Sequence, residues 1–408
     1  MNMLRAGAAK ADITPKEALL PLPLLGPLQF TRINDHIFVR VLALESGNRR
    51  ALVATFDLTF VPDAEGYKEA LFAAFHIPEE YIFLAATHTH EAVPLFAARL
   101  LTREDDASKS SMSWKEHIKE GLMKAAGEAI ASLRPARMGA GTGKSYINCN
   151  RDEIKSGEKA ELGYNFERPS DKTLRAVRLE DEAGVPIAFL VNYACHAVVM
   201  NGCIERGGVG VSGDFPGRTA SAVEARHGGV CLWTSSAAGD QNPRMMTNFG
   251  VKVIDGKPVY QNLGETGHLV LELLTEEHVR DVERTLETIR CAPFAGEIAA
   301  GEGSAFCPRT DGGETEYRCT LLKAGGLTLA GVDAEVPTSI GAAILNEMKE
   351  EAIFISLVNG YKGYIPDDWQ LEHHSFETEG APLASGYAEQ SLKETFRRLD
   401  AEINGGNL

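Results

Sequence analysis

Apolar runs and helically spaced apolar positions alternate along most of the chain. Runs bounded by turn residues predict strands over residues 5–13, 37–45, 50–58, 81–85, 137–141, 173–179, 186–195, 229–235, 295–301, 317–322, 327–332 and 352–358. Apolar positions at helical spacing predict helices over residues 63–76, 112–133, 215–226, 263–290 and 338–351. No internal repeat and no linker rich in Pro, Gly or Ser divides the chain. The pattern predicts one α/β domain (α+β mixed) over residues 1–408, a large mixed β-sheet core flanked by helices.

Charge and cysteine content narrow the class of protein. The net charge is −16, from 41 basic and 57 acidic residues, and the acids are scattered. Nucleic acid and anionic membranes need a concentrated basic face, so we expect neither as a partner. The seven cysteines form no C-x-x-C pair, and the chain has no signal-like segment and no run of 18 apolar residues. We therefore expect a cytoplasmic protein with reduced thiols and no stable membrane association.

Histidines follow one of the predicted strands. The apolar run that begins at Tyr81 leads into Thr87-His88-Thr89-His90. In an extended chain, positions i and i+2 point to the same face, so both imidazoles are expected to face one pocket. Such a pair indicates either a metal centre or two polar histidines on a surface hairpin.

Polar residues also follow other predicted strands. They are Cys195-His196, Gly239-Asp240-Gln241-Asn242-Pro243 and Asp333-Ala334-Glu335. A single histidine after an apolar strand, such as His196, is more often a hydrogen-bonded core residue than a ligand. Asp57, Asp214 and Asp240 are interpreted as partners that orient the histidines, or as caps of helices and turns.

Several short motifs, taken in order, resemble the neutral (non-lysosomal) ceramidase family of zinc amidases, which cleave N-acyl bonds. The resemblance spans nearly the whole chain. The matching pieces are Ala11-Asp-Ile-Thr-Pro15, Ala86-Thr-His-Thr-His90, Asn150-Arg151, Cys195-His196 with Met200, Ser212-Gly-Asp214, Gly239-Asp240 with Pro243, Glu335, and Leu357-Val-Asn-Gly-Tyr361 followed by Tyr364.

The resemblance implies roles for individual residues. His88, His196 and Glu335 correspond to zinc ligands, a set typical of catalytic zinc sites with an open position. His90, Arg151 and Tyr387 correspond to residues that hold the substrate and stabilise the oxyanion. The implied fold is that of the ceramidase catalytic domain. The C-terminal sandwich domain of long family members is expected to be absent.

Two positions depart from the family pattern. Asn242 stands where the family has a serine, and an amide cannot act as a nucleophile. Phe376-Glu377 stands where the family has a tyrosine ligand followed by glutamate, and a phenyl ring cannot coordinate a metal. His373, His374, Glu377 or water are the candidate replacements.

These observations predict a zinc-dependent amidohydrolase that cleaves a linear amide of a small soluble substrate by metal-activated water. Asn242 is then expected to orient the substrate or donate to the oxyanion. Alternatives on the same fold are a metal-dependent esterase, lactonase or glycoside hydrolase, and a catalytically silent ligand-binding protein.

Overall fold

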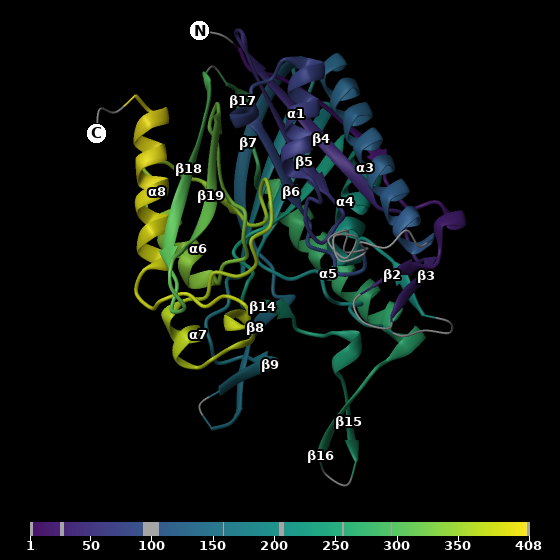
Figure 1. Ribbon diagram of the computed structural model, residues 1–408. Coiled ribbons are helices and arrows are strands. Elements are labelled where there is room, and N and C mark those ends of the chain that lie inside the picture. The colour runs from purple at the N-terminus through teal and green to yellow at the C-terminus, as the bar shows by residue number, and fades with distance from the viewer. Residues whose placement is uncertain are drawn as a thin grey trace.

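The computed structural model describes residues 3–24, 28–92, 106–157, 159–203, 208–254, 257–294 and 296–405. Its largest element is a nine-stranded sheet in the order β13-β11-β10-β7-β1-β4-β5-β6, with β17 added beside β7 (Figure 1). The pairs β5–β6 and β11–β13 are parallel and the other pairs are antiparallel, so the sheet is mixed. Its strands are β1 (Arg5–Asp12), β4 (Phe38–Ser46), β5 (Arg49–Phe56), β6 (Ile82–Ala86), β7 (Arg134–Lys144), β10 (Thr173–Asp181), β11 (Pro186–Tyr193), β13 (Val230–Ser235) and β17 (Ala292–Pro293).

The nine-stranded sheet curls so that its two ends approach each other. The end strand β13 contacts β4, β5 and β6 as well as its neighbour β11. Beyond the strands, Thr89 and Ala197 form a parallel bridge between the segment after β6 and the segment after β11. The curl therefore brings together two loops that follow strands at opposite ends of the strand order.

A second sheet of four strands packs against the first. Its order is β18-β19-β20-β21, with bounds β18 (Ile298–Pro308), β19 (Glu314–Ala324), β20 (Leu327–Val332) and β21 (Ile353–Ile355). Alternate residues of β20 point to opposite faces, as the two-residue period of a strand requires. Leu327 and Leu329 join a core shared with the large sheet, whereas Ala330 and Val332 face the helices outside.

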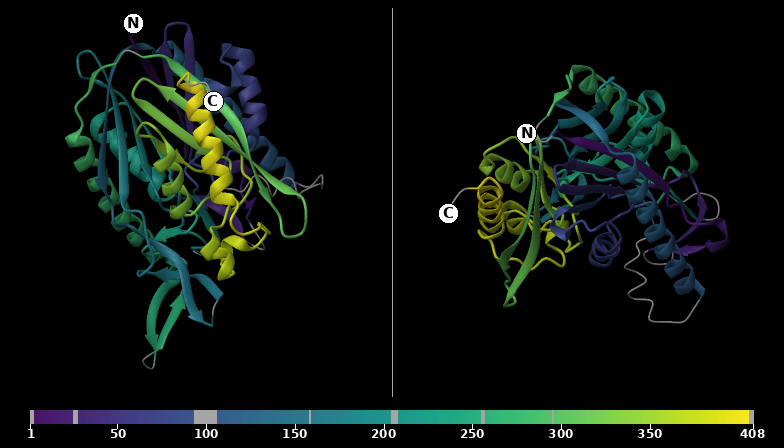
Figure 2. Two further views of the ribbon diagram at one scale, coloured as in Figure 1. Left: turned by 90° about the vertical axis from the view of Figure 1, so that its left-hand side faces the viewer. Right: turned by 90° about the horizontal axis from the view of Figure 1, so that it is seen from above.

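Helices cover the outer faces of both sheets. The helix α3 packs on β1 and β4, α4 and α5 cover β13, β10 and β7, and α6 and α8 cover the small sheet. Seen from above, α8 and α3 lie on opposite sides of the molecule (Figure 2). The helices are α1 (Ala64–Phe75), α3 (Asp106–Ala131), α4 (Asp214–His227), α5 (Gly267–Thr288), α6 (Thr338–Glu347), α7 (Asp368–Glu372) and α8 (Ala388–Ile403). Short 3₁₀ helices span Glu17–Leu19, Glu79–Tyr81, Thr247–Phe249, Gly264–Thr266 and Phe376–Thr378.

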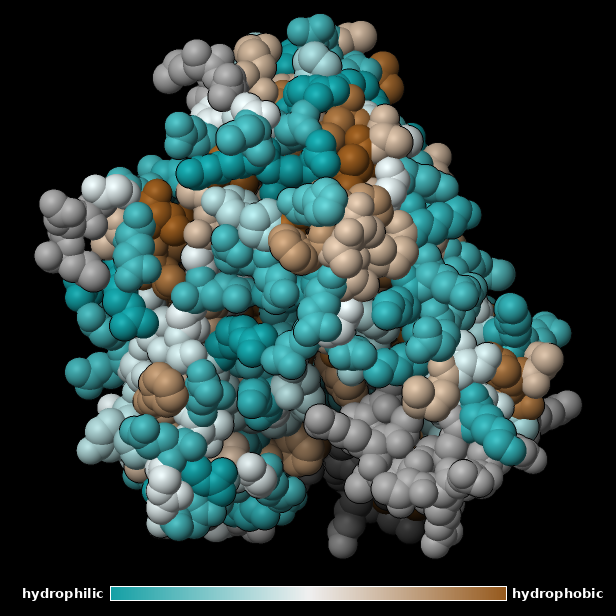
Figure 3. Space-filling view, turned by 45° about the horizontal axis from the view of Figure 1, so that its top comes forward, coloured by the Kyte–Doolittle hydropathy of each residue, from teal (hydrophilic) through white to brown (hydrophobic). Residues whose placement is uncertain are grey.

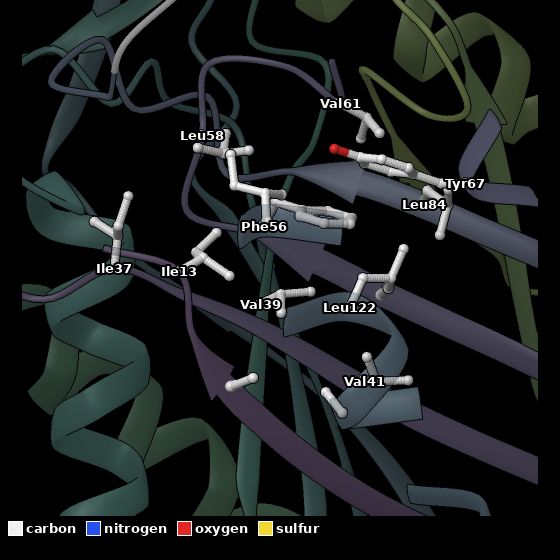
Figure 4. Close-up of a cluster of buried hydrophobic side chains, with 14 of the residues drawn as sticks. Ile13, Ile37, Val39, Val41, Phe56, Leu58, Val61, Tyr67, Leu84 and Leu122 are labelled. Carbon is white, nitrogen blue, oxygen red and sulfur yellow. The ribbon is translucent and has the colours of Figure 1, made fainter. Parts of the chain in front are cut away.

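The core beneath α3 illustrates how the apolar pattern is used. Val39 and Val41 of β4 face Leu122 of α3, and Tyr67 of α1 lies above Phe56 of β5 (Figure 4). Trp114 of α3 is fully buried, and its indole nitrogen donates to the carbonyl oxygen of Ile13 at 2.7 Å. The helix is thus held both by apolar burial and by a satisfied polar group.

Three smaller sheets extend the body. They are β12-β3-β2 (Val209–Val211, Gln29–Ile33, Leu22–Pro23), β14-β8-β9 (Gln241–Pro243, Asn148–Ser156, Lys159–Asn165) and the hairpin β15-β16 (Gly250–Ile254, Lys257–Gln261). The hairpin projects from the lower end of the molecule in Figure 1. Pairing of β14 with β8 sets Asn242 opposite Cys149, two residues before Arg151.

The predicted mixed sheet with flanking helices is confirmed, and the predicted helices and the longer strands all occur. The elements that were not predicted are β2, β3, β8, β9, β12, β14, β15, β16, β17, α7 and α8. The seven cysteines form no disulfide in the structure. Among the described residues, no helix is both long and apolar enough to cross a membrane. On the face drawn in Figure 3, hydrophobic residues form small separate groups among hydrophilic ones.

Candidate metal centre and cavity

Two histidines and one glutamate from three separate loops converge on one point. His88 follows β6, His196 follows β11, and Glu335 lies between β20 and α6. Glu335 Oε2 is 3.1 Å from His88 Nε2 and 2.9 Å from His196 Nε2. All three side chains are buried, with at most 3% of each exposed.

The other ring nitrogen of each histidine fixes how the ring is presented. His88 Nδ1 lies 2.7 Å from the carbonyl oxygen of Thr59, and His196 Nδ1 lies 2.7 Å from that of Ala238. A carbonyl only accepts, so each ring donates its Nδ1 proton to the carbonyl and turns Nε2 toward Glu335.

In the neutral form of both rings, three acceptors face one another, and a cation would satisfy them. In the described part of the chain, the buried Glu335 Oε2 has no hydrogen-bond partner. Lone pairs that converge without a proton are electrostatically unfavourable, and a buried unsatisfied oxygen calls for an explanation. Two imidazoles and a carboxylate are a donor set that zinc accepts, so these residues fit the predicted metal.

His90 is a fourth potential donor. The ligand nitrogens of His88, His90 and His196 all lie within 4.8 Å of one another. The His90 backbone nitrogen donates to the carbonyl oxygen of Ala197 at 3.1 Å, which links the two histidine loops. Burial, and then the neighbouring His88 and His196, hold the pKa of His90 well below its usual range. His90 is thus neutral at physiological pH.

The structure corrects how His88 and His90 come to share a pocket. The extended-chain argument requires β geometry at both residues, but His88 has φ of 66°, in the left-handed region. The two rings still lie edge to face, with centroids 4.8 Å apart. The two imidazoles converge as predicted, but the extended backbone on which that prediction rested is absent at His88. The hydrogen bond from the His88 nitrogen to the carbonyl oxygen of Leu58 accompanies this turn.

Arg151 places a buried positive charge beside the histidines. Its side chain is 4% exposed, and its Nη1 lies 3.1 Å from His196 Nε2 and 3.3 Å from Asn242 Oδ1. Its Nη2 donates to the Tyr364 hydroxyl at 3.2 Å. Burial and then the Arg151 charge lower the pKa of His196 to about 4. The ring of His196 is therefore neutral.

Two tyrosine hydroxyls at the centre were given no role by sequence analysis. The Tyr361 hydroxyl lies 3.1 Å from Glu335 Oε1, and the Tyr364 hydroxyl lies 3.4 Å from His196 Nε2. Burial, followed by the charge of Glu335, raises the pKa of both tyrosines, so both hydroxyls keep their protons. Their place in the motif that begins at Leu357 was the signal that could have identified them.

The remaining predicted site residues lie in different places. Asn242 lines the cavity beside Arg151. Tyr387 immediately precedes α8 with 53% of its surface exposed and is not among the described residues that line the cavity. The structure thus brings together His88, His90, Arg151, His196, Asn242 and Glu335, but not Tyr387.

Residues 373–377, which include the departure from the family pattern at Phe376-Glu377, make contacts other than those of a metal ligand. Phe376 lines the cavity, with its ring 5.9 Å from that of Tyr364. Glu377 accepts from Arg151 Nε at 2.7 Å. His373 stacks on Trp369 with ring centroids 3.9 Å apart, and His374 is exposed. The contacts of His373 and Glu377 are therefore with protein groups other than the histidine cluster.

The proposed aspartate partners of the histidines are also elsewhere. Asp57 binds Arg40 at 2.7 Å, Asp214 accepts from the Met200 nitrogen at 2.9 Å, and Asp240 accepts from Asn150 at 2.9 Å. Backbone carbonyls hold the two Nδ1 atoms instead. Of the two interpretations of these aspartates, the one that makes them partners of the histidines is contradicted, while Asp214 and Asp240 accept from backbone nitrogens at the starts of α4 and α6.

The centre lies at the wall of a cavity of about 430 Å³. Thr59, His88, His90, Arg151, Asn242 and Glu335 form part of its polar wall, and apolar side chains form much of the remainder. The apolar lining consists of Leu24, Leu28, Phe60, Leu162, Val198, Met246 and Phe376. Phe60 and Tyr361 stack with ring centroids 5.0 Å apart. A mostly apolar hollow with a few convergent polar groups is typical of a small-molecule site.

Comparison with known proteins agrees with this architecture. No family model matches the chain, and no curated protein matches it in sequence. A crystal structure of neutral ceramidase from Pseudomonas aeruginosa superposes with a TM-score of 0.78 at 15% identity, covering 100% of this chain and 76% of that one. A structure described as ceramidase complexed with C2 gives a TM-score of 0.77 with the same identity and coverage. The chain therefore has the fold of neutral ceramidase, which confirms the resemblance at the level of the fold.

Proposed function

We propose that the protein is a zinc-dependent hydrolase of a linear amide in a small substrate. The observation that carries this proposal is the convergence of the His88 and His196 lone pairs on Glu335 Oε2, whose buried oxygen has no hydrogen-bond partner in the described structure. When bound there, zinc lowers the pKa of water towards neutrality and polarises a carbonyl, so no side-chain nucleophile is required. The ceramidase fold, found at 15% identity, supports amide over other acyl substrates.

The polar groups around the ligands have separate tasks in this proposal. Arg151 carries a fixed positive charge, and with the protonated Tyr364 hydroxyl it can stabilise the negative charge that develops on the carbonyl oxygen. His90, neutral at physiological pH, can hold the substrate by a hydrogen bond. Asn242 accepts from Arg151 through Oδ1, which leaves its amide nitrogen to donate to the substrate.

The cavity limits the substrate. A volume of about 430 Å³ suits a compact molecule, and the apolar lining favours a short aliphatic or aromatic acyl group. The small molecule is the only partner that this proposal requires.

The test begins with metal content and then measures turnover. Purified protein is loaded with zinc, dialysed, and assayed for metal and for hydrolysis of a panel of N-acyl amides with matched esters. We expect about one zinc per chain and amide cleavage that a chelator abolishes. His196→Ala should lose both. Zinc binding with no turnover of any panel member would favour the silent ligand-binding alternative, and turnover of the esters alone would reassign the reaction.

A further inference from the structure

Arg151 and a metal ion cannot both use the same atom of His196. The neutral ring has one lone pair on Nε2, and Arg151 Nη1 lies 3.1 Å from it. The guanidinium also carries a full positive charge that opposes a divalent cation at that point. The position of Arg151 therefore affects how tightly the ligand set holds a metal.

Glu377 holds the opposite edge of the guanidinium. Its Oε1 lies 2.7 Å from both Nε and Nη2 of Arg151, and its Oε2 accepts from the Ser375 hydroxyl at 2.6 Å. Glu377 is 1% exposed, so little water screens this ion pair. The rings of Tyr364 and Phe376 lie 5.5 Å and 5.6 Å from the guanidinium carbon. Together these contacts limit the guanidinium to a narrow range of positions.

Without Glu377, Glu335 remains as a carboxylate that attracts Arg151 from the side of the histidines. The charge of Glu335 already acts on Arg151. Asp152, the other nearby carboxyl, accepts from Gln370 at 3.1 Å.

We propose that Glu377 is a positioning residue that restrains Arg151 and so keeps Glu335 and His196 available to a metal. Glu377 neutralises the arginine charge from the side away from the histidines. Removing Glu377 frees the guanidinium to pair with Glu335 and to retain the lone pair of His196, in competition with the metal. This inference rests on the metal site of the proposed function, but not on amide hydrolysis.

The test is a double-variant cycle on zinc affinity. Zinc alone is titrated against a chromogenic chelator with the full-length wild-type protein, Glu377→Gln, Arg151→Met and the double variant. We expect Glu377→Gln to weaken zinc binding by about 10- to 100-fold, the range for groups that support a ligand set. Arg151→Met should bind zinc more tightly than the wild type. In the Arg151→Met background, Glu377→Gln should have little further effect, because there is no guanidinium to release.

Two controls keep the result interpretable. Glu379→Gln removes a carboxylate two residues away that is 63% exposed and pairs with Lys159 at 3.8 Å, and it should leave zinc affinity unchanged. Thermal unfolding of each variant establishes that it is folded. If Arg151→Met does not fold, Arg151→Gln, which also removes the positive charge, replaces it in the cycle with the same expected results.

Equal losses from Glu377→Gln with and without Arg151 would overturn the inference, and so would an unchanged affinity in the single variant. A wild-type protein that binds zinc but cleaves no amide would contradict the proposed reaction and leave this cycle valid. Failure of the wild type to bind zinc would remove the metal site itself. The two failures are therefore distinguishable.

Discussion

Backbone carbonyls set the tautomers of His88 and His196. The type of a residue does not reveal which side chain its carbonyl oxygen will contact. The sequence could nominate the two histidines and Glu335 because the motifs containing them are ordered as in a known family. Thr59 and Ala238, which supply the carbonyls, could not be nominated, since any residue type has the same backbone oxygen. The hydroxyls of Tyr361 and Tyr364 were within reach of sequence analysis, because both residues stand in a quoted motif.

Variants of Asn242 test whether catalysis needs the serine that the family has at this position. It lines the cavity and accepts from Arg151 at 3.3 Å. If water is the nucleophile, Asn242→Ala should lower kcat by roughly 10- to 1,000-fold, because a polar group beside the oxyanion is lost. The measurement is kcat and kcat/KM of Asn242→Ala and Asn242→Ser on an amide that the wild type cleaves. Unchanged kinetics in both variants would remove Asn242 from the catalytic machinery.

The burial of His278 predicts that the folded protein loses stability in acid. It is fully buried, with Nδ1 3.1 Å from the Ser145 hydroxyl and Nε2 accepting from Trp233 at 3.2 Å. Burial lowers the pKa of His278 to about 3. Between about pH 6.5 and pH 3 the unfolded chain therefore binds a proton that the folded protein does not. The free energy of unfolding should fall on acidification through this window, by about 1.4 kcal/mol per pH unit for this residue.

Urea unfolding at several pH values measures that slope. His278→Gln removes the titrating group, while its amide can replace both hydrogen bonds, so its slope should be smaller by about one proton. His117→Gln, at a partly exposed position of α3, is the control for replacing a histidine with glutamine. Identical slopes for wild type and His278→Gln would show that burial does not suppress protonation of His278.

At the scale of elements, most long periodic segments were predicted, but α8, with 16 residues, was missed, as were the short elements. The helix α3 carries 26 residues of consistent pattern, whereas β14 has three residues and α7 has five. Such short elements take their structure from neighbours, as β14 does by pairing with β8. The position of Arg151 depends on β8, so the arrangement of the polar wall could not be derived from local pattern.

At Gly239, the loop that follows β13 closely approaches the loop that carries Glu335. A Cβ atom there would lie 2.8 Å from the carbonyl carbon of Val336 and 2.9 Å from its oxygen, and backbone cannot rotate away. The Gly239 nitrogen also donates to that oxygen at 2.8 Å. Gly239→Ala should push the Glu335 segment away from His196, weakening zinc binding by about tenfold or more and destabilising the fold by about 1–3 kcal/mol.

Zinc titration and urea unfolding of Gly239→Ala test this contact. Gly127→Ala, on α3, is the control, because its Cβ would meet only Phe75, at 3.6 Å, an ordinary contact distance. That substitution should be neutral or stabilising, since alanine favours a helix more than glycine does. Wild-type zinc affinity in Gly239→Ala would show that the two loops adjust independently.

At the scale of the whole molecule, the ligands connect parts of the chain that are far apart in sequence. His88 and His196 follow strands of the large sheet, and Glu335 follows β20 of the small one. Sequence analysis predicted a single mixed sheet with helices, but not the curl that brings β13 against β4, β5 and β6. That curl depends on packing between distant segments, for which alternation along a single strand carries no signal.

Because the ligand set spans both sheets, metal binding should stabilise the fold as a whole. A ligand that binds only the folded state adds about 2.7 kcal/mol at a free concentration one hundred times its Kd. For a chain of this size that corresponds to a rise in Tm of about 3 °C.

Thermal unfolding with and without zinc should show this shift in the wild type and its loss in His196→Ala. Tyr387→Phe should keep the shift, because Tyr387 is half exposed and does not line the cavity among the described residues. An equal rise in all three proteins would place the stabilising metal elsewhere on the molecule.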